Sequence, residues 1–347
     1  MAQRLLVISH GHPRFNRGGG EYAAYAVHEH IRNLPGWQSL FLAAAPSGRL
    51  SSACDLEQLV HGAEWLLRPT QDWLLFESVI DLGDGSPLQE LIQSWKPTVI
   101  HWHHFHRVGI DALLAISRWC PEARVVFTLH EFLALCPYQG QLLTTNNVMC
   151  PGPSTEACSA CLPDIDVADL LIRDALMRRL MAEVDSWIAP SRQLADLYIE
   201  WGLDRSRIEI VEYALPGILM SAYEKSLGTH QVASEIVGPP VRFGFLGNVL
   251  PSKGLDVILL AFSELVDTCP GACLTVFGSI PESWSDRPLA HQAFYERVHY
   301  LLEALGEAVE ILGGYGQEQV PELIRQVDWV VMGSVWRENS PVVILEA

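Results

Sequence analysis

Short apolar runs alternate with helical patterns along the whole chain, and this alternation limits the fold more than any other sequence feature. The first series of expected strands is 4–9, 39–44, 98–102, 124–129 and 186–189. The helices expected between them are 21–33, 87–95, 111–119, 167–184 and 191–201. Strands that alternate with helices of about ten residues are typical of parallel α/β units with helices on both faces of the sheet.

The alternation restarts after a stretch of glycines and prolines, which predicts a second domain. Its expected strands are 241–246, 272–277, 309–312 and 329–332, and its expected helices are 254–268, 289–305 and 319–326. A chain of 347 residues is also longer than one typical core supports. We therefore predict two Rossmann-like, doubly wound α/β domains, 1–215 and 240–347, joined by a linker at 216–239 and facing a ligand cleft.

The last segment predicts that the second domain is truncated at its C-terminus. Residues 341–347 would form the first turns of a helix, and no further strand or helix follows them in the sequence. Because a doubly wound domain normally contains more units than this second series supplies, we expect it to be incomplete.

Charge and hydropathy narrow the class of protein. The net charge of −18 argues against a nucleic-acid partner, because phosphate backbones favour clustered Lys and Arg. The first apolar run, 5–8, is too short for a signal peptide, and no run reaches the roughly 18 residues of a membrane span. These features predict a cytoplasmic protein, in which the eight cysteines are mostly reduced thiols or metal ligands.

Two glycine-bearing segments each follow an expected strand and open an expected helix. In the first, Gly19 and Gly20 would let a ligand approach the free N–H groups of the helix, although a flexible turn is equally consistent. In the second, Lys253 and Gly254 follow Asn248, and a lysine at such a junction can hold a diphosphate. Neither segment is a dinucleotide fingerprint or a P-loop, and Lys253 alone could be an ordinary surface lysine.

Two glutamates, Glu338 and Glu346, lie eight positions apart at the end of the chain. Pro341 suits the first turn of a helix, so we expect Glu338 in the preceding loop and Glu346 about one turn into the helix. Carboxylates placed in this way can accept hydrogen bonds from sugar and ribose hydroxyls.

Taken in order, these segments resemble glycosyltransferase family 4, whose members have the GT-B fold. That family has a Gly-Gly loop after its first strand, a Gly-Arg-x4-Lys-Gly segment that opens its second domain, and two glutamates separated by seven residues in the donor site. The resemblance covers essentially the whole chain, and its most specific part is the segment 312–347.

The resemblance implies a role for each matching residue. Glu338 would face the transferred sugar, Glu346 would hold the ribose hydroxyls, and Lys253 would neutralise the departing diphosphate. Asn248 stands where the family has a phosphate-binding arginine, so either another cation replaces it or donor binding differs. The further donor-site candidates are Gly19, Gly20, Asn339 and Ser340.

Histidines follow two expected strands of the first domain. His130 ends the strand 124–129 in a Thr-Leu-His-Glu segment that matches the family's Thr-Leu-His-Asp, and in the family this histidine faces the reacting sugar. A lone histidine would otherwise be a structural residue. The cluster from His101 to His106 suggests a zinc-dependent hydrolase, but Phe105 stands where such a site needs an aspartate. We expect one or two of these histidines to line the acceptor side.

Four cysteines lie in an insert at 136–161, just after His130. They are Cys136, Cys150, Cys158 and Cys161. The final Cys-x2-Cys pair, among glycines and prolines, has the spacing of a structural zinc site. Reduced thiols and, in an oxidising setting, disulfides are the alternatives.

The resemblance implies a retaining, metal-independent hexosyltransferase that works in polysaccharide or cell-surface glycan biosynthesis. It would move a sugar from a UDP- or GDP-sugar to a glycan or lipid-linked acceptor, with no cofactor required for catalysis. The helix 167–184 carries Arg173, Arg178 and Arg179 and could contact anionic lipid at the inner face of the membrane, although most such helices only pack on their sheet. The alternatives are the zinc-dependent hydrolase and a non-catalytic sugar-nucleotide-binding module.

Overall fold

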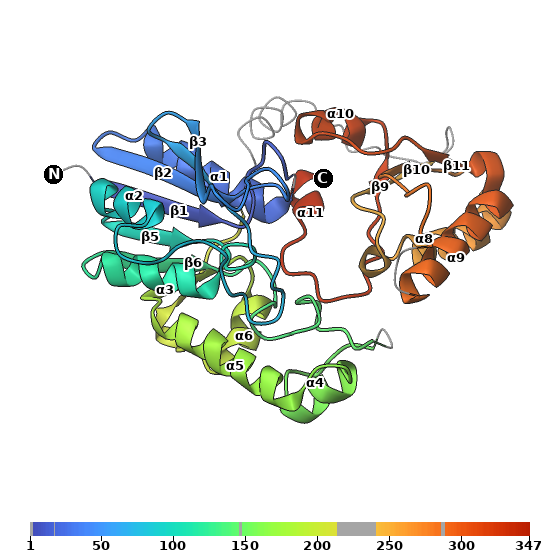
Figure 1. Cartoon of the computed structure of the whole chain (residues 1–347). Helices are drawn as coiled ribbons and strands as arrows, with labels where there is room; N and C mark the ends of the chain where they lie inside the picture. Colours follow the sequence, from blue (N-terminus) through green and yellow to red (C-terminus); the bar gives the residue numbers. More distant parts are fainter. Residues whose placement is uncertain (1–2, 17, 146–147, 214–240, 286–288) are drawn as a thin grey trace. The chain divides into compact units, whose positions relative to one another are not determined.

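The chain forms two compact units, Met1–Tyr213 (unit 1) and Ala214–Ala347 (unit 2) (Figure 1). The computed structural model describes residues 3–16, 18–145, 148–213, 241–285 and 289–347. The linker predicted at 216–239 lies outside these residues. Each unit contains its own sheet and its own apolar core.

Unit 1 is built on an eight-stranded sheet with the order β3-β4-β2-β1-β5-β6-β7-β8. The strands are β1 (Gln3–Ser9), β2 (Trp37–Ala44), β3 (Leu56–Val60), β4 (Glu64–Leu67), β5 (Val99–Trp102), β6 (Arg124–Thr128), β7 (Ser186–Ala189) and β8 (Ile208–Ile210). Neighbours are parallel except for the antiparallel edge pair β3–β4. The strand order reverses between β1 and β5, which is the point where open α/β sheets bind ligands at the carboxyl ends of their strands.

Helices cover both faces of this sheet, as the sequence predicts. They are α1 (Gly19–Arg32), α2 (Pro87–Trp95), α3 (Ile110–Trp119), α4 (Thr155–Cys161), α5 (Val167–Ala182) and α6 (Arg192–Trp201). Strand β1 shows why: Leu6 and Ile8 join one buried cluster, whereas Leu5 and Val7 join the other. Successive side chains of a strand point to opposite faces, so a strand that is apolar throughout needs cover on both.

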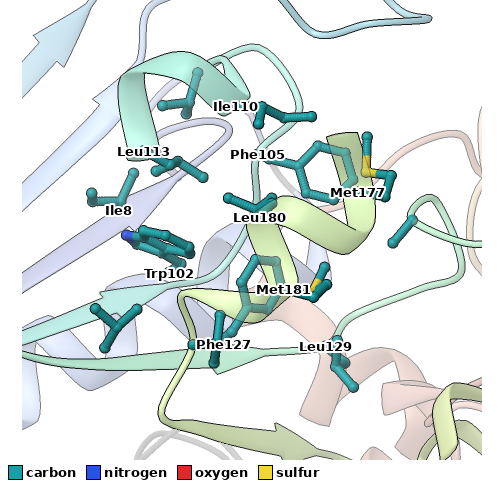
Figure 2. Close-up of a cluster of buried hydrophobic side chains, with 14 of the residues drawn as sticks. Ile8, Trp102, Phe105, Ile110, Leu113, Phe127, Leu129, Met177, Leu180 and Met181 are labelled. Atoms are coloured by element: carbon teal, nitrogen blue, oxygen red, sulfur yellow. The ribbon is translucent and has the colours of Figure 1, made fainter. Parts of the chain in front are cut away.

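The larger core lies between the sheet and α3 and α5. Figure 2 shows Trp102 and Phe127 from neighbouring strands packed near Leu180 and Met181 of α5. Trp102 and Leu180 are fully buried. Burial of large apolar side chains is the main source of stability for such a layer, and here it fixes the carboxyl ends of β5 and β6.

Unit 2 contains a four-stranded parallel sheet with the order β11-β10-β9-β12. The strands are β9 (Arg242–Leu246), β10 (Cys273–Phe277), β11 (Val309–Ile311) and β12 (Trp329–Val330), and the helices are α8 (Leu255–Thr268), α9 (Leu289–Leu305), α10 (Val320–Arg325) and α11 (Val342–Glu346). Strand β12 is shorter than the predicted 329–332. Leu259, Leu274 and Val298 belong to the buried core that joins the helices to the sheet.

One surface prediction for α5 is wrong. Arg173 is buried, 3% exposed, and its guanidinium donates to the carbonyls of Leu133 and Ala134. Because buried carbonyls need donors, this arginine serves the loop after β6 and not a basic surface. Arg178 and Arg179 are exposed but pair at 2.7 Å with Asp174 of the same helix and with its C-cap residue Glu183. Among the described helices, none is long and apolar enough to cross a membrane.

Candidate functional site

A row of hydrogen-bonded side chains follows β5 and β6 in unit 1. His103 Nδ1 lies 2.9 Å from His130 Nε2, and His130 Nδ1 lies 2.5 Å from the hydroxyl of Tyr213. His130 stacks on both partners. Burial lowers the pKa of His103 and of His130 well below the ordinary value, so both rings are neutral near pH 7. A neutral ring can donate through one nitrogen and accept through the other, and His130 uses both of its nitrogens, which fixes its orientation.

Two further histidines of this region are paired with carboxylates. His10 Nε2 lies 3.1 Å from Glu21 Oε1, and His104 Nε2 lies 3.2 Å from Glu131 Oε1. Burial acts to raise the pKa of Glu21. The hydrogen bond from His10, together with smaller contributions from other contacts, has the larger effect and leaves that pKa below its ordinary value. Burial raises the pKa of Glu131 to about 8. The region therefore contains one ionised and one protonated carboxyl group at neutral pH.

The glycines at the start of α1 allow close packing against these histidines. A Cβ atom on Gly20 would lie 3.3 Å from His10 Cε1 and 3.7 Å from His130 Cγ. Gly19 is the first residue of α1, and Gly18 lies against the carboxylate of Glu21. A Cβ atom at position 20 would crowd His10 and lie in ordinary contact with His130. The structure thus brings the predicted glycine segment and the predicted His130 together.

The histidine cluster does not form the metal site that a zinc-dependent hydrolase needs. His101 Nε2 lies 2.7 Å from the hydroxyl of Thr128, and its ring lies 4.2 Å from the ring of His103 at a tilt of 38°. Within the residues that the structure describes, no three imidazoles and carboxylates of this cluster bring their ligand atoms within 4.8 Å of one another. The hydrolase alternative is therefore not favoured.

In unit 2, Lys253 and Glu338 form an ion pair. Lys253 Nζ donates to Glu338 Oε1 at 2.6 Å, and the same oxygen accepts from Ser334 Oγ at 2.6 Å and from Trp336 Nε1 at 2.9 Å. Lys253 Nζ also lies 5.2 Å from the centre of the Trp336 ring. Partial burial raises the pKa of Glu338, but the three donors and the lysine charge bring it below the ordinary value, so Glu338 is ionised near pH 7.

The backbone around Gly254 packs the loop before α8 against the loop before α11. Gly254 has φ +62°, which favours glycine, and a Cβ atom there would collide with the carbonyl oxygen of Gly333. The N–H of Val335 donates to the carbonyl of Ser252 at 2.9 Å. The Lys-Gly step therefore lets the loop before α8 touch the loop before α11, which brings Lys253 to Glu338.

The other predicted donor residues lie around the same loops. Glu346 is the last residue of α11, one short helix after Glu338. Its charge adds to burial in raising the pKa of Tyr315 to about 12. Asn339 and Ser340 are half-buried, and Asn248 is exposed after β9. These positions agree with the expected donor site, and the roles of the residues stay predictions.

Arg337 and Tyr213 are site residues that the sequence reasoning missed. Arg337 stands between Trp336 and Glu338, and its Nε is buried with no hydrogen-bond partner in the described part of the chain. An arginine directly before Glu338 was visible in the sequence as a cation beside the glutamate pair. Tyr213 follows the last strand of unit 1 and gave no signal of its own.

The four cysteines of the insert affect one another electrostatically. Burial raises the pKa of Cys136 to about 11, and the thiols of Cys150 and Cys158 add to this shift. Cys158 is affected in turn by Cys150 and Cys161. Among the described residues, no three of the four sulfur atoms lie within 4.8 Å of one another, and no disulfide joins them. Structural zinc at these cysteines stays a prediction.

A family model described as Glycosyltransferase Family 4 matches residues 17–213, more than half of the chain. The chain belongs to glycosyltransferase family 4. A second model, described as Glycosyl transferases group 1, matches residues 229–347 and thus includes the Lys253, Glu338 and Glu346 segments. The resemblance predicted from the motifs is confirmed.

Relatives of this family 4 glycosyltransferase share its sequence over part of the chain and its fold over nearly all of it. The D-inositol 3-phosphate glycosyltransferase of Nocardia farcinica is 29% identical over 199 residues, 54% of this chain and 41% of that relative. The match therefore spans less than half of the relative.

Two solved structures confirm the predicted GT-B fold with two Rossmann-like domains. HepE of Anabaena in complex with UDP has a TM-score of 0.59 and 17% identity, and the match covers 99% of this chain and 78% of HepE. The catalytic domain of starch synthase IV from Arabidopsis thaliana, bound to ADP and acarbose, has a TM-score of 0.54 and 14% identity, with 96% and 78% covered.

Proposed function

We propose that this chain transfers a hexose from a nucleotide diphosphate sugar, a UDP- or GDP-sugar, to a glycan or lipid-linked acceptor. The observation that carries the proposal is the pairing of Lys253 with Glu338 in unit 2, with Glu346 one short helix further on. The complexes of HepE with UDP and with UDP-glucose support a donor of this class.

The donor is bound through groups whose charges complement it. Oε1 of Glu338 is occupied by three donors, whereas the structure describes no hydrogen bond to Oε2. Oε2 can therefore accept from a sugar hydroxyl. Lys253 is 30% exposed and can turn from Glu338 toward a diphosphate. Glu346 accepts from the ribose hydroxyls, as the family resemblance implies.

The transfer proceeds with retention of the anomeric configuration. The acceptor oxygen forms the new bond to the anomeric carbon while the bond from that carbon to the phosphate oxygen breaks, on the same face of the sugar. The acceptor proton passes to the leaving phosphate oxygen. Neutral His130 positions the reacting groups, and Lys253 with helix N-termini stabilises the charge that develops on the diphosphate, so no divalent metal ion is required.

A transfer assay tests the proposal. The chain is incubated without added divalent metal with UDP- and GDP-hexoses and a panel of simple glycosides and lipid-linked acceptors. The product is analysed by mass spectrometry and by NMR of its anomeric proton. The proposal predicts a product with the anomeric configuration of the donor. An inverted product would contradict retention. Donor binding without transfer would favour the non-catalytic sugar-nucleotide-binding module.

Structural zinc at the insert is part of the same proposal. Zinc would need Cys136, Cys150, Cys158 and Cys161 as thiolates, although burial favours the thiol form of Cys136 and Cys158 in its absence. Metal analysis of the double variants Cys158→Ser/Cys161→Ser and His101→Asn/His103→Asn distinguishes zinc at the cysteines from zinc at the histidines. Zinc lost with the cysteines alone supports the insert, and zinc lost with the histidines alone would revive the hydrolase.

A further inference from the structure

A buried polar cluster lies where the second half of α1 packs on β2 and β4, and it includes none of the residues proposed above for sugar transfer. Its members are His28, Glu29 and Glu64, whose ligand atoms all lie within 4.8 Å of one another. His28 and Glu64 are buried, and Glu29 is partly exposed. No other group of three or more such side chains comes so close together in the described residues.

His28 presents an unused nitrogen to this cluster. Its side chain is 0% exposed, its Nδ1 lies 2.8 Å from Ser39 Oγ, and its Nε2 has no hydrogen-bond partner among the described residues. The Oε1 atom of Glu29 is 3.9 Å away, too far for a hydrogen bond. When Nδ1–H donates to Ser39, Nε2 carries the lone pair, and an imidazole held in this way is the form that binds metal ions.

The carboxylate of Glu64 is already oriented by its neighbours. Its Oε1 accepts from the hydroxyl of Tyr25 at 3.0 Å, and its Oε2 lies 3.1 Å from His12 Nε2. Hydrogen bonds of this kind hold a ligating carboxylate in one position and leave lone pairs on both oxygens. Glu64 therefore meets the requirement of a prearranged ligand.

Arg32 is the cation that a metal ion would displace. Its Nη1 lies 2.8 Å from Glu29 Oε1 and 3.9 Å from Glu64 Oε1. The arginine side chain is 38% exposed, so it can turn into solvent at small cost. The charge of one arginine does not balance the charges of two carboxylates, and the arginine leaves the Nε2 atom of His28 without a partner. A divalent ion would balance both charges and would also bind this nitrogen.

We propose that His28, Glu29 and Glu64 bind a divalent ion of the zinc class, which ties α1 to the sheet of unit 1. One imidazole nitrogen and two carboxylate oxygens suit zinc and its neighbours, whereas magnesium and calcium prefer oxygen ligands alone. Three protein ligands leave a position for water. With the metal bound, the cluster would hold α1 to the sheet, independently of the proposed sugar transfer.

Cobalt(II) titration of the chelator-treated full chain tests the site. The Cys158→Ser/Cys161→Ser background removes the Cys-x2-Cys pair, so a cobalt spectrum without a thiolate charge-transfer band reports nitrogen and oxygen ligands. We expect one equivalent of cobalt, displaced by zinc. Binding should weaken at least about tenfold in Glu29→Gln and stay unchanged in the control Glu90→Gln, an exposed glutamate on α2.

Replacement of Arg32 should have the opposite effect on the affinity for cobalt. Arg32→Gln removes the competing cation, so we expect cobalt to bind about two- to fivefold more tightly. If Arg32 is instead the only cation that the cluster binds, this variant loses stability and gains no affinity for metal. The proposal is overturned if cobalt does not bind in the double-serine background, if Glu29→Gln binds as tightly, or if Arg32→Gln binds no more tightly.

Discussion

Lys253 Nζ and Glu338 Oε1 lie 2.6 Å apart although 85 positions separate them in the chain. The pair joins the loop that opens α8 to the loop that precedes α11. Both side chains are partly shielded from solvent, with 30% and 15% exposed, so their attraction is screened less than that of a surface pair. In the proposed function, Lys253 would turn from Glu338 to the diphosphate of the donor.

Replacement of Lys253 should weaken both donor binding and turnover. We expect Lys253→Ala to lower kcat/KM for the donor by about a hundredfold or more, because the cation acts on the charge that develops in the leaving group. Arg325→Ala, which removes an exposed cation of the same unit, is the matched control and should behave as wild type. Steady-state kinetics with a saturating acceptor measure the effect, and equal kcat/KM values for the two variants would contradict it.

Arg337 should supply the cation that Asn248 does not. We expect Arg337→Ala to weaken binding of the nucleoside diphosphate about tenfold. Binding of the nucleoside monophosphate should weaken much less, because only the diphosphate carries the second phosphate group. Arg337→Lys should recover part of the loss. Calorimetric titration with both nucleotides checks this, and an equal loss for the two nucleotides would mean that Arg337 does not contact the diphosphate.

Tyr213 and His103 should act on transfer through His130. Tyr213→Phe removes the hydroxyl that lies 2.5 Å from His130 Nδ1 and leaves the ring in place. We expect Tyr213→Phe and His103→Asn each to lower kcat about tenfold with little change in the donor KM, because a displaced His130 no longer orients the reacting groups. His61→Asn, an exposed histidine of the same unit, is the control. A changed donor KM with unchanged kcat would argue against this role.

The contribution of Glu131 to the stability of unit 1 should fall as pH rises from about 5 to 8, whereas His103 and His130, whose pKa values burial lowers, contribute in the opposite sense. The folded state keeps the proton of this buried carboxyl up to a pKa of about 8, whereas the unfolded carboxyl loses it near 4.5. The stability that this carboxyl group contributes is fully present below pH 4.5 and is lost as pH rises through about 8. Glu131→Gln mimics the protonated form, so its Tm relative to wild type should rise over this range. Thermal melts at several pH values measure it, and parallel curves would rule out the effect.

Much of the fold could be predicted because local signals agreed with it. Helix α2 spans the predicted Pro87–Trp95, since Ser86 caps it by accepting from the N–H of Gln89 and proline suits its first turn. The antiparallel pair β3–β4 was missed because its strands are short and irregular, with a register shift between Gln58 and Val60. Strand β8 and helix α4 are short elements that were missed in the same way.

The candidate site could be predicted only where its residues stand at strand ends or helix starts. Lys253, Glu338 and His130 occupy such positions, and topology brings them to an edge of their sheets. Their partners depend on tertiary contacts, which no local pattern shows: Trp336 and Ser334 on Glu338, and the row that links His103 to His130. Burial of Arg173 was also invisible, because the carbonyls that it satisfies belong to a distant loop.

Thermal stabilisation of the full chain by a panel of UDP-, GDP-, ADP- and dTDP-sugars tests the proposed donor site directly. We expect one nucleotide class to raise Tm in a concentration-dependent way. We also expect Glu346→Gln and Lys253→Ala to reduce this shift greatly, while Arg325→Ala keeps it. A wild-type chain that no nucleotide sugar stabilises, or a shift that Lys253→Ala and Glu346→Gln both retain in full, would contradict a donor site built on these residues.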